Sequence, residues 1–120
     1  MRAWLFLALL GLGLGLAQPR IVGVEDLRAV LGNPKVFIID VRTPQEFAQG
    51  HVQGAVNWPL QEIERWWSKV PKDREVYIYC NTQNRSGAAV QYLMSRGYQN
   101  LRMVHGGIQA WMARRYPLAR

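Results

Sequence analysis

The only cysteine in the chain, Cys80, is the side chain best placed for covalent chemistry. It follows an apolar run at 75–79, and the stretch 87–96, beyond a few polar residues, has the character of a helix. A thiol between a strand and a helix faces the N–H groups and positive dipole end of that helix, which favour a thiolate and a bound anion. The position indicates a nucleophile; the alternative is a small buried apolar side chain.

The polar segment after Cys80 favours the nucleophile. Its members are Asn81, Thr82, Gln83, Asn84, Arg85 and Ser86. A structural thiol does not need a loop of hydrogen-bonding side chains, and a nearby arginine favours the charged form of a thiol. We therefore treat 80–86 as the candidate active loop.

Composition limits the classes of protein to consider. The chain has 120 residues and is 49% apolar, enough for one domain with a core. Its net charge of +7 favours anionic ligands, but the basic residues are scattered, so we interpret most of them as a solvated surface and expect no nucleic-acid partner. One cysteine and two separated histidines do not make a zinc site.

Residues 1–17 differ from the remainder of the chain. A short positive start, Met1-Arg2, precedes an uncharged apolar stretch and small residues that a signal peptidase could read. We expect a cleaved secretory signal, a domain at 18–120 and a periplasmic or secreted location. The alternative is a retained anchor, but the apolar stretch is short for a span of about 20 residues. In an oxidising compartment a single cysteine is shielded, linked to a partner or a working thiol.

Apolar bursts alternate with segments of helical period, which is typical of an α/β domain with a parallel sheet. We expect strands at 36–39, 55–58, 76–79 and 101–104, and helices at 24–31, 61–69, 87–96 and 108–115. Thr43 and Glu46 form a capping box that opens a further helix ending near Gly50.

The carboxyl ends of the predicted strands gather the polar candidates. Asp40, Arg42 and Cys80 all follow strands, and ligands of such sheets bind outside these ends. His105 follows the last strand in the same way. We interpret His105 and His51 as structural, hydrogen-bonded groups rather than catalytic bases.

Adjacent tryptophans mark the predicted helix at 61–69. Trp66 and Trp67 point about 100° apart on a helix, so they cannot both face the core equally. The exposed ring either lies along the surface or contacts a partner or a membrane interface. Trp111 is expected in the core.

Four motifs, at 40–47, 50–57, 80–86 and 106–111, resemble in order and spacing those of the rhodanese family of sulfurtransferases. The resemblance extends from about residue 23 to residue 117. It implies a three-layer α/β domain with a five-stranded parallel sheet flanked by helices, and an active cysteine after the fourth strand.

The resemblance also implies a reaction, that of a thiosulfate sulfurtransferase. Cys80 would take the outer sulfur of thiosulfate or a similar small anionic donor, expel sulfite, and pass the sulfur from a persulfide to cyanide or a thiol. N–H groups of 81–86 would stabilise the negative charge without a metal or organic cofactor. Arg85 would bind the sulfonate end, its alternative being a salt bridge to a nearby acid.

The remaining site residues have supporting roles by this resemblance. Asp40 and Arg42 are expected to brace the loop, or simply to pair with each other. Ser86 either caps the helix or donates to the persulfide, and we favour the cap. Thr82 and Asn84 are interpreted as scaffolding.

Gln83 departs from the family pattern, in which glycine is common. If this position needs a positive φ, glutamine costs about 1 kcal/mol there and narrows the pocket, which would change the preferred donor.

Three other functions remain open. A phosphatase or arsenate reductase uses a similar cysteine loop, but its loop typically has one residue more between the cysteine and the arginine. A rhodanese-like binding module commonly lacks the cysteine, which is present here. A persulfide carrier would use the same chemistry and deliver sulfur to a protein partner, and the sequence does not separate it from an enzyme.

Overall fold

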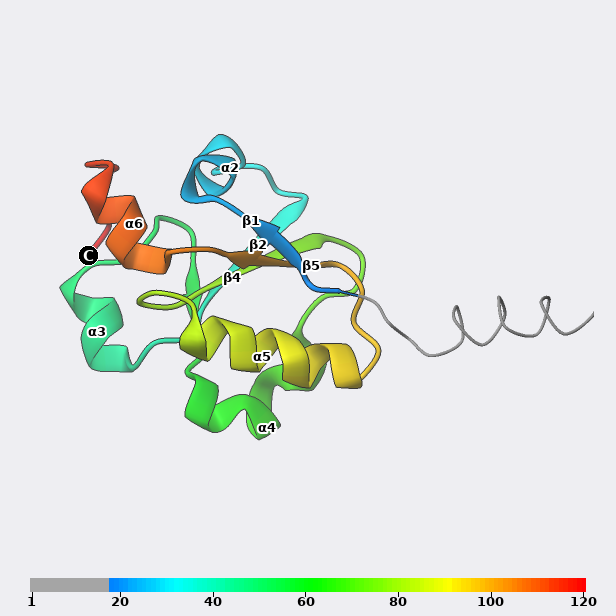
Figure 1. Ribbon diagram of the computed structural model, residues 1–120. Helices are drawn as coiled ribbons and strands as arrows, with labels where there is room; N and C mark the ends of the chain where they lie inside the picture. Colours follow the sequence, from blue (N-terminus) through cyan, green and yellow to red (C-terminus); the bar gives the residue numbers. More distant parts are fainter. Residues whose placement is uncertain (1–17) are drawn as a thin grey trace, which may run out of the picture.

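The computed structural model describes residues 18–120 and has a central sheet of five parallel strands (Figure 1). The strands are β1 (Arg20–Val22), β2 (Val36–Asp40), β3 (Val56–Asn57), β4 (Glu75–Tyr79) and β5 (Leu101–Val104). Their order across the sheet is β1-β5-β4-β2-β3. The predicted signal at 1–17 lies outside the described residues.

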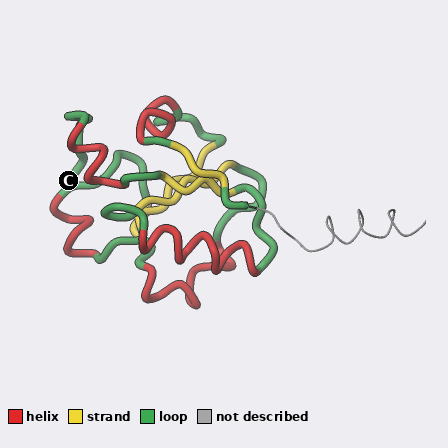
Figure 2. Tube along the Cα trace, in the orientation of Figure 1, coloured by secondary structure: helices red, strands yellow, loops and turns green. Residues whose placement is uncertain are grey.

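Helices cover both faces of the sheet, which gives the three layers expected (Figures 1 and 2). They are α2 (Val24–Ala29), α3 (Pro44–Gln49), α4 (Ile63–Trp66), α5 (Asn84–Ser95) and α6 (Gly107–Ala113), with 3₁₀ turns η1 (Leu60–Glu62) and η2 (Trp67–Lys69) beside α4. The α4 and α5 helices cover one face and α2 and α6 the other, while α3 lies at the carboxyl end of the strands.

Strand β4 supplies both cores because successive side chains of a strand point to opposite faces. Val76, Ile78 and Cys80 pack on the α5 side. Tyr77 and Tyr79 pack on the α2 and α6 side. All five are buried. The Cys80 side chain therefore follows the alternation of β4, and its thiol is buried beneath the protein surface.

Three elements differ from the sequence-based prediction by more than one or two residues at their ends. Strand β1 was not predicted, because an edge strand of three residues with an exposed Ile21 has neither an apolar run nor an alternation to detect. Helix α5 begins at Asn84 rather than at 87, because the polar residues of its first turn resemble a loop. The helix predicted at 61–69 is divided into η1, α4 and η2.

The tryptophans have the expected arrangement. Trp66 is buried and its indole N–H donates to the Pro59 carbonyl at 2.8 Å, whereas Trp67 is half-buried under the guanidinium of Arg96. Trp111 is fully buried.

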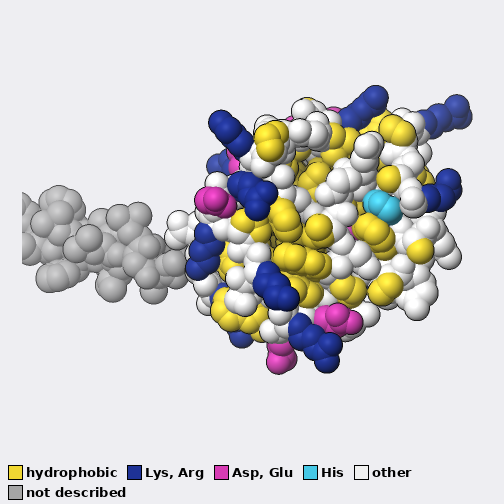
Figure 3. Space-filling model, turned by 180° about the vertical axis from the view of Figure 1, so that it is seen from behind, with side chains coloured by type: hydrophobic (Ala, Val, Ile, Leu, Met, Phe, Trp, Pro, Cys, Tyr) yellow, Lys and Arg dark blue, Asp and Glu magenta, His cyan; other side chains and the backbone are white. Residues whose placement is uncertain are grey.

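The surface in Figure 3 carries lysine and arginine side chains dispersed among apolar and neutral groups. Within residues 18–120, every helix is too short or too polar to cross a membrane.

Candidate active site

Cys80 and Asp40 lie at the same edge of the sheet, as predicted. Asp40 is the register partner of Tyr79, the residue before Cys80, and the Val41 N–H donates to the Tyr79 carbonyl at 3.1 Å. His105 also follows its strand at this edge, where its N–H donates to the Val22 carbonyl at 2.8 Å and its side chain is exposed.

The Cys80 thiol is 1% exposed and contacts a hydroxyl. Its Sγ lies 3.4 Å from the Oγ of Ser86, which donates to the Gln83 carbonyl at 3.2 Å. The expectation that Ser86 caps the helix is wrong. The cap position is Gln83, and Ser86 lies in the first turn of α5, where a helical side chain leans back toward the N-terminus and so reaches the sulfur.

The N–H groups of residues 81–86 have no acceptor among residues 18–120. The carbonyls of Cys80 and Asn81, in contrast, accept from the N–H groups of Ile108 at 2.9 Å and Gln109 at 3.1 Å. Because a trans peptide holds its C=O and N–H on opposite sides, binding these carbonyls to α6 turns the following N–H groups away from α6. The loop therefore offers free donors while its carbonyls are bound.

Gly107 permits this approach of α6 to the loop, a role that sequence reasoning did not identify. Its φ is +54°, and a Cβ at this position would lie 2.3 Å from the Cys80 carbonyl oxygen. The side chain of Gln109 adds a second contact, from Nε2 to the Oδ1 of Asn81 at 3.1 Å. The glycine pair at 106–107 was the available signal, since it indicates a close approach of two backbone segments.

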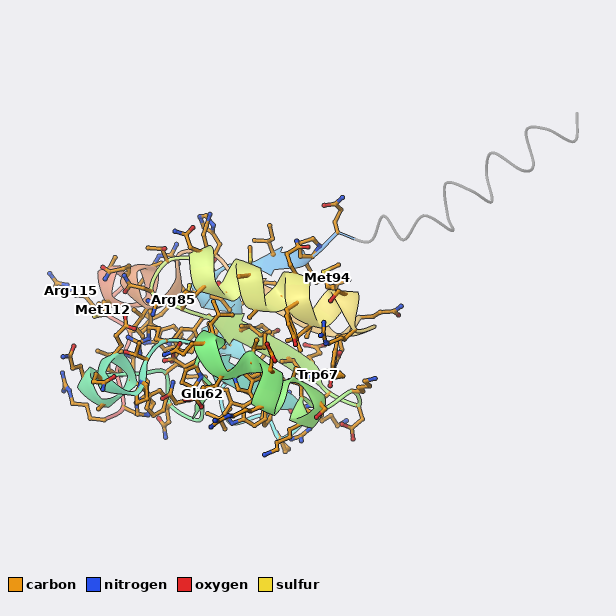
Figure 4. The ribbon with its side chains drawn as sticks, turned by 90° about the horizontal axis from the view of Figure 1, so that it is seen from below. Glu62, Trp67, Arg85, Met94, Met112 and Arg115 are labelled. Atoms are coloured by element: carbon orange, nitrogen blue, oxygen red, sulfur yellow. The ribbon has the colours of Figure 1, made fainter. Side chains whose placement is uncertain are left out.

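Arg85 forms a bidentate ion pair with Glu46 of α3, the salt bridge left open as an alternative. Nη1 donates to Oε1 at 2.6 Å and Nη2 to Oε2 at 3.0 Å. The hydrogen bond from Arg85 lowers the pKa of Glu46 to about 2, and Glu46 in turn raises the pKa of Arg85. Both side chains are about one-third exposed, and Arg85 lies at the start of α5 in Figure 4.

Sequence reasoning assigned Glu46 only to the capping box, which is confirmed. The Glu46 N–H donates to the Oγ1 of Thr43 at 3.2 Å, and the Thr43 N–H donates to Oε1 of Glu46 at 3.0 Å. The same carboxylate therefore caps α3 and holds Arg85.

Asp40 and Arg42 form a second, buried pair. Nη2 of Arg42 donates to Oδ2 of Asp40 at 2.8 Å and to the Gly50 carbonyl at 2.6 Å. Burial opposes the charge of Arg42, but Asp40 outweighs it and raises the pKa of the guanidinium. Within residues 18–120 no hydrogen bond joins this pair to 81–86, but the Arg42 guanidinium lies over the ring of Tyr79, the residue before Cys80.

The side chains of the other candidate residues make few contacts with the loop or the thiol. Gln83 has a φ of −160°, so this position does not need the positive φ considered for it, and the cost of glutamine argued from a positive φ does not arise. The side chains of Thr82 and Asn84 are exposed. His51 stacks on Phe47, and its Nδ1 lies 3.0 Å from the Phe47 carbonyl, which fits a structural role. No cluster of three or more potential metal ligands is found in the part of the chain described.

Known proteins resemble the chain over most of these elements. The family model for the rhodanese-like domain matches residues 23–114. A sulfurtransferase of Allochromatium vinosum is 42% identical over 83 residues, which are 69% of this chain and 78% of that protein. The thiosulfate sulfurtransferase PspE of Escherichia coli is 44% identical over 70 residues, 57% of this chain and 67% of PspE.

A solved structure agrees with the fold. The crystal structure of a rhodanese-related protein from Thermoplasma volcanium has a TM-score of 0.76 and 32% sequence identity. The match covers 83% of this chain and 97% of that one, so the sheet and its covering helices are shared almost in full.

Proposed function

Because the chain belongs to the rhodanese-like domain family, we propose that it is a sulfurtransferase that carries sulfur as a persulfide on Cys80. The observation that supports the proposal most is the loop itself, in which six consecutive N–H groups that have no acceptor within residues 18–120 follow the thiol. Such groups stabilise a negative charge in a buried site without a metal ion.

We propose thiosulfate as the donor, in line with the match to PspE. The thiolate of Cys80 attacks the outer sulfur of thiosulfate, a new S–S bond forms at Sγ, and the old S–S bond breaks. Its electron pair leaves with sulfite, and the persulfide keeps one negative charge. The free N–H groups of 81–86 stabilise that charge, and the hydroxyl of Ser86, 3.4 Å from Sγ, can donate to it by turning its proton away from the Gln83 carbonyl.

Arg85 is proposed to bind the sulfonate end of the donor. A guanidinium has five N–H donors, about two of which are occupied by Glu46, so donors remain for an anion. The ion pair fixes the guanidinium near the start of α5 and so reduces the side-chain entropy lost on binding.

The second half-reaction returns Cys80 to its starting form. A thiol acceptor attacks the outer sulfur, the S–S bond at Cys80 breaks, and its electron pair returns to Sγ. The proton of the thiol ends on the outer sulfur of the new persulfide. With cyanide as acceptor, the product is thiocyanate.

Mass spectrometry of the intact protein tests the proposal. After incubation with thiosulfate and removal of small molecules, wild type should gain the mass of one sulfur atom, and cyanide should remove it. Cys80→Ser is the matched control and should gain nothing. A wild-type protein that gains no sulfur, or a serine variant that gains as much, would contradict a persulfide on Cys80.

We also propose that the protein is exported, because residues 1–17 have the composition of a secretory signal. N-terminal sequencing of the protein from the periplasm or medium of expressing cells should begin at Gln18. A chain that keeps residue 1 and remains with the cells would contradict export.

A further inference from the structure

Three adjoining hollows lie at the amino end of the sheet, at the edge opposite Cys80. Their volumes are about 420, 270 and 570 Å³. The first and second share Tyr98 and Gln99, and the second and third share Lys72 and Asn100, so the hollows form one continuous surface. Four strands begin on this surface or beside it, at Arg20, Val36, Glu75 and Leu101.

The fold gathers on this surface basic side chains that are scattered along the sequence. Five of them line the hollows: Arg20, Lys35, Lys72, Arg74 and Arg102. Arg96 lies beside them, next to Gly97 of the second hollow. We call the hollows and Arg96 the basic face. Its acids are Asp73 and Glu75, whereas elsewhere residues 18–120 carry eight basic and six acidic side chains. Most of the net positive charge of the domain therefore lies on the basic face.

The two acids do not neutralise the basic face. Asp73 and Glu75 make only long contacts, of 3.8 and 3.7 Å, with arginines of the same face. Within residues 18–120, no salt bridge is formed by Arg20, Lys35 or Lys72. Residues 1–17 contain no acid that could supply one. A cluster of unpaired cations attracts a partner that carries several negative charges.

Aromatic and apolar side chains border the basic face. Arg96 is exposed, and its guanidinium lies 3.8 Å from the centroid of the Tyr92 ring and 5.1 Å from that of the Trp67 ring. Ile21, next to Arg20 on the edge strand β1, is 57% exposed. Tryptophan and tyrosine rings are favoured at a membrane interface, where one side of the ring is apolar and the other is wet.

The position of the N-terminal segment indicates which polyanion contacts this face. Residues 3–16 are the uncharged apolar stretch of the proposed secretory signal, a kind of segment that enters the membrane during export. Gln18 and Pro19 come just after the signal and line the 420 Å³ hollow. During the proposed export, the basic face is therefore the side of the domain next to the lipid headgroups.

We propose that the basic face binds the headgroups of anionic lipids and holds the domain on a membrane surface after the signal is removed. The choice of lipid rests on the proposed export, and it does not depend on the persulfide chemistry. Each basic side chain near an anionic surface raises the affinity by about fivefold, and salt weakens the attraction. Several such side chains together give reversible binding without an inserted helix.

Binding through the basic face directs the active loop away from the lipid. Helix α5 runs from the loop toward the basic face, and its 12 residues span about 18 Å. Figure 4 shows Arg85 at the start of α5, with Met94 and Trp67 toward the other end. The loop then lies beyond the screening length of about 8 Å at physiological salt, so small anions reach it without repulsion from the lipid.

Sedimentation with lipid vesicles tests the proposal. The protein that begins at Gln18 is used, because both cores consist of residues that follow it. It should sediment with vesicles of equal parts phosphatidylglycerol and phosphatidylcholine, remain in solution with phosphatidylcholine alone, and be released by salt. Equal binding to the two kinds of vesicle, or binding to neither, would overturn the proposal.

Two variants locate the binding. Lys35→Glu and Lys72→Glu change exposed side chains of the basic face, and each should weaken binding to the anionic vesicles by about fivefold or more. Arg115→Glu is the matched control, since it makes the same change of charge on an exposed residue at the opposite end of the molecule in Figure 4. It should keep most of the wild-type affinity. A control that loses as much as the lysine variants would overturn the basic face in favour of net charge alone.

Further measurements separate the remaining alternatives. Binding to polyglutamate without binding to anionic vesicles would overturn the lipid in favour of an acidic protein. On the vesicles, cyanide should remove the persulfide at the rate of the free protein, and a slower rate would contradict the orientation. A protein that binds the vesicles but forms no persulfide would contradict the proposed sulfur transfer and support this inference. Export is tested separately by N-terminal sequencing, so the two failures are distinguishable.

Discussion

Helices α3 and α5 both begin near the active site, and their first turns are satisfied in opposite ways. At α3, Thr43 and Glu46 exchange hydrogen bonds, so the first turn has acceptors from its own side chains. At α5, the cap residue Gln83 makes no side-chain hydrogen bond, and the N–H groups from 81 to 86 have no acceptor within residues 18–120. The start of α3 is therefore satisfied by its own side chains, whereas the start of α5 keeps donors available for the negative charge of the proposed reaction.

The largest effect is expected from Gly107→Ala. Gly107 lies at the start of α6 against the Cys80 carbonyl, so this change disturbs the loop that precedes α5. The new Cβ would collide with the Cys80 carbonyl, and the positive φ adds strain, so we expect a loss of about 3 kcal/mol in unfolding free energy. The rate of persulfide formation should fall by about tenfold or more, because the loop must shift. Urea unfolding and a single-turnover assay with thiosulfate measure the two effects.

Gly97→Ala is the matched control for this variant. Its φ is +92°, but nothing lies within 4 Å of an added Cβ. It should lose about 1 kcal/mol from backbone strain alone and keep the rate of wild type. Equal losses of rate in the two variants would contradict the role assigned to Gly107.

Ser86→Ala tests whether the hydroxyl beside the Cys80 sulfur takes part in the reaction. Removing a hydroxyl that can turn its proton from the Gln83 carbonyl to the developing charge should slow persulfide formation by about tenfold, with a change in stability of about 1 kcal/mol or less. Ser95→Ala is the control, since Ser95 also donates to a carbonyl three residues earlier, that of Tyr92, on the exposed end of the same helix. If both variants react at the rate of wild type, Ser86 has no role beyond packing.

Thr43→Ala removes the side-chain cap at the start of α3. The loss of the cap on α3 should cost about 1 kcal/mol in unfolding free energy. Urea unfolding measures it, with the exposed Ser68→Ala as a control. A cost no greater than that of the control would mean that the capping box does not stabilise α3.

The smallest effect is expected from the pH dependence of the Glu46 and Arg85 pair. Because the pKa of Glu46 is lowered from 4.5 to about 2, the pair stabilises the folded state fully above pH 4.5 and loses this contribution as pH falls toward 2. Exposure of both groups keeps the contribution small. The difference in unfolding free energy between wild type and Glu46→Gln should be constant above pH 5 and shrink below 4.5; a difference that grows on acidification would contradict the pairing.

Much of this arrangement could be predicted from local sequence signals. The strands before Asp40 and Cys80 are continuous apolar runs, and the Thr43 box marks the start of its helix. Parallel strands then bring their carboxyl ends to one edge, which predicts that Asp40 and Cys80 lie together.

The contacts within the site depend on distances that the sequence does not encode locally. The pairing of Arg85 with Glu46 joins residues far apart in the chain, and either residue could have found another partner. The start of α5 was misplaced because asparagine, arginine and serine occur equally in loops and first turns, which also led to the wrong role for Ser86.

The most direct test of the account follows the backbone amides by NMR as thiosulfate converts Cys80 to the persulfide. The account predicts that the largest changes in ¹⁵N and ¹H chemical shift fall on the N–H groups of 81–86, while those of 44–46 on α3 change little. Changes that are absent from 81–86, or equal at both helix starts, would contradict the claim that the open end of α5 holds the charge of the reaction.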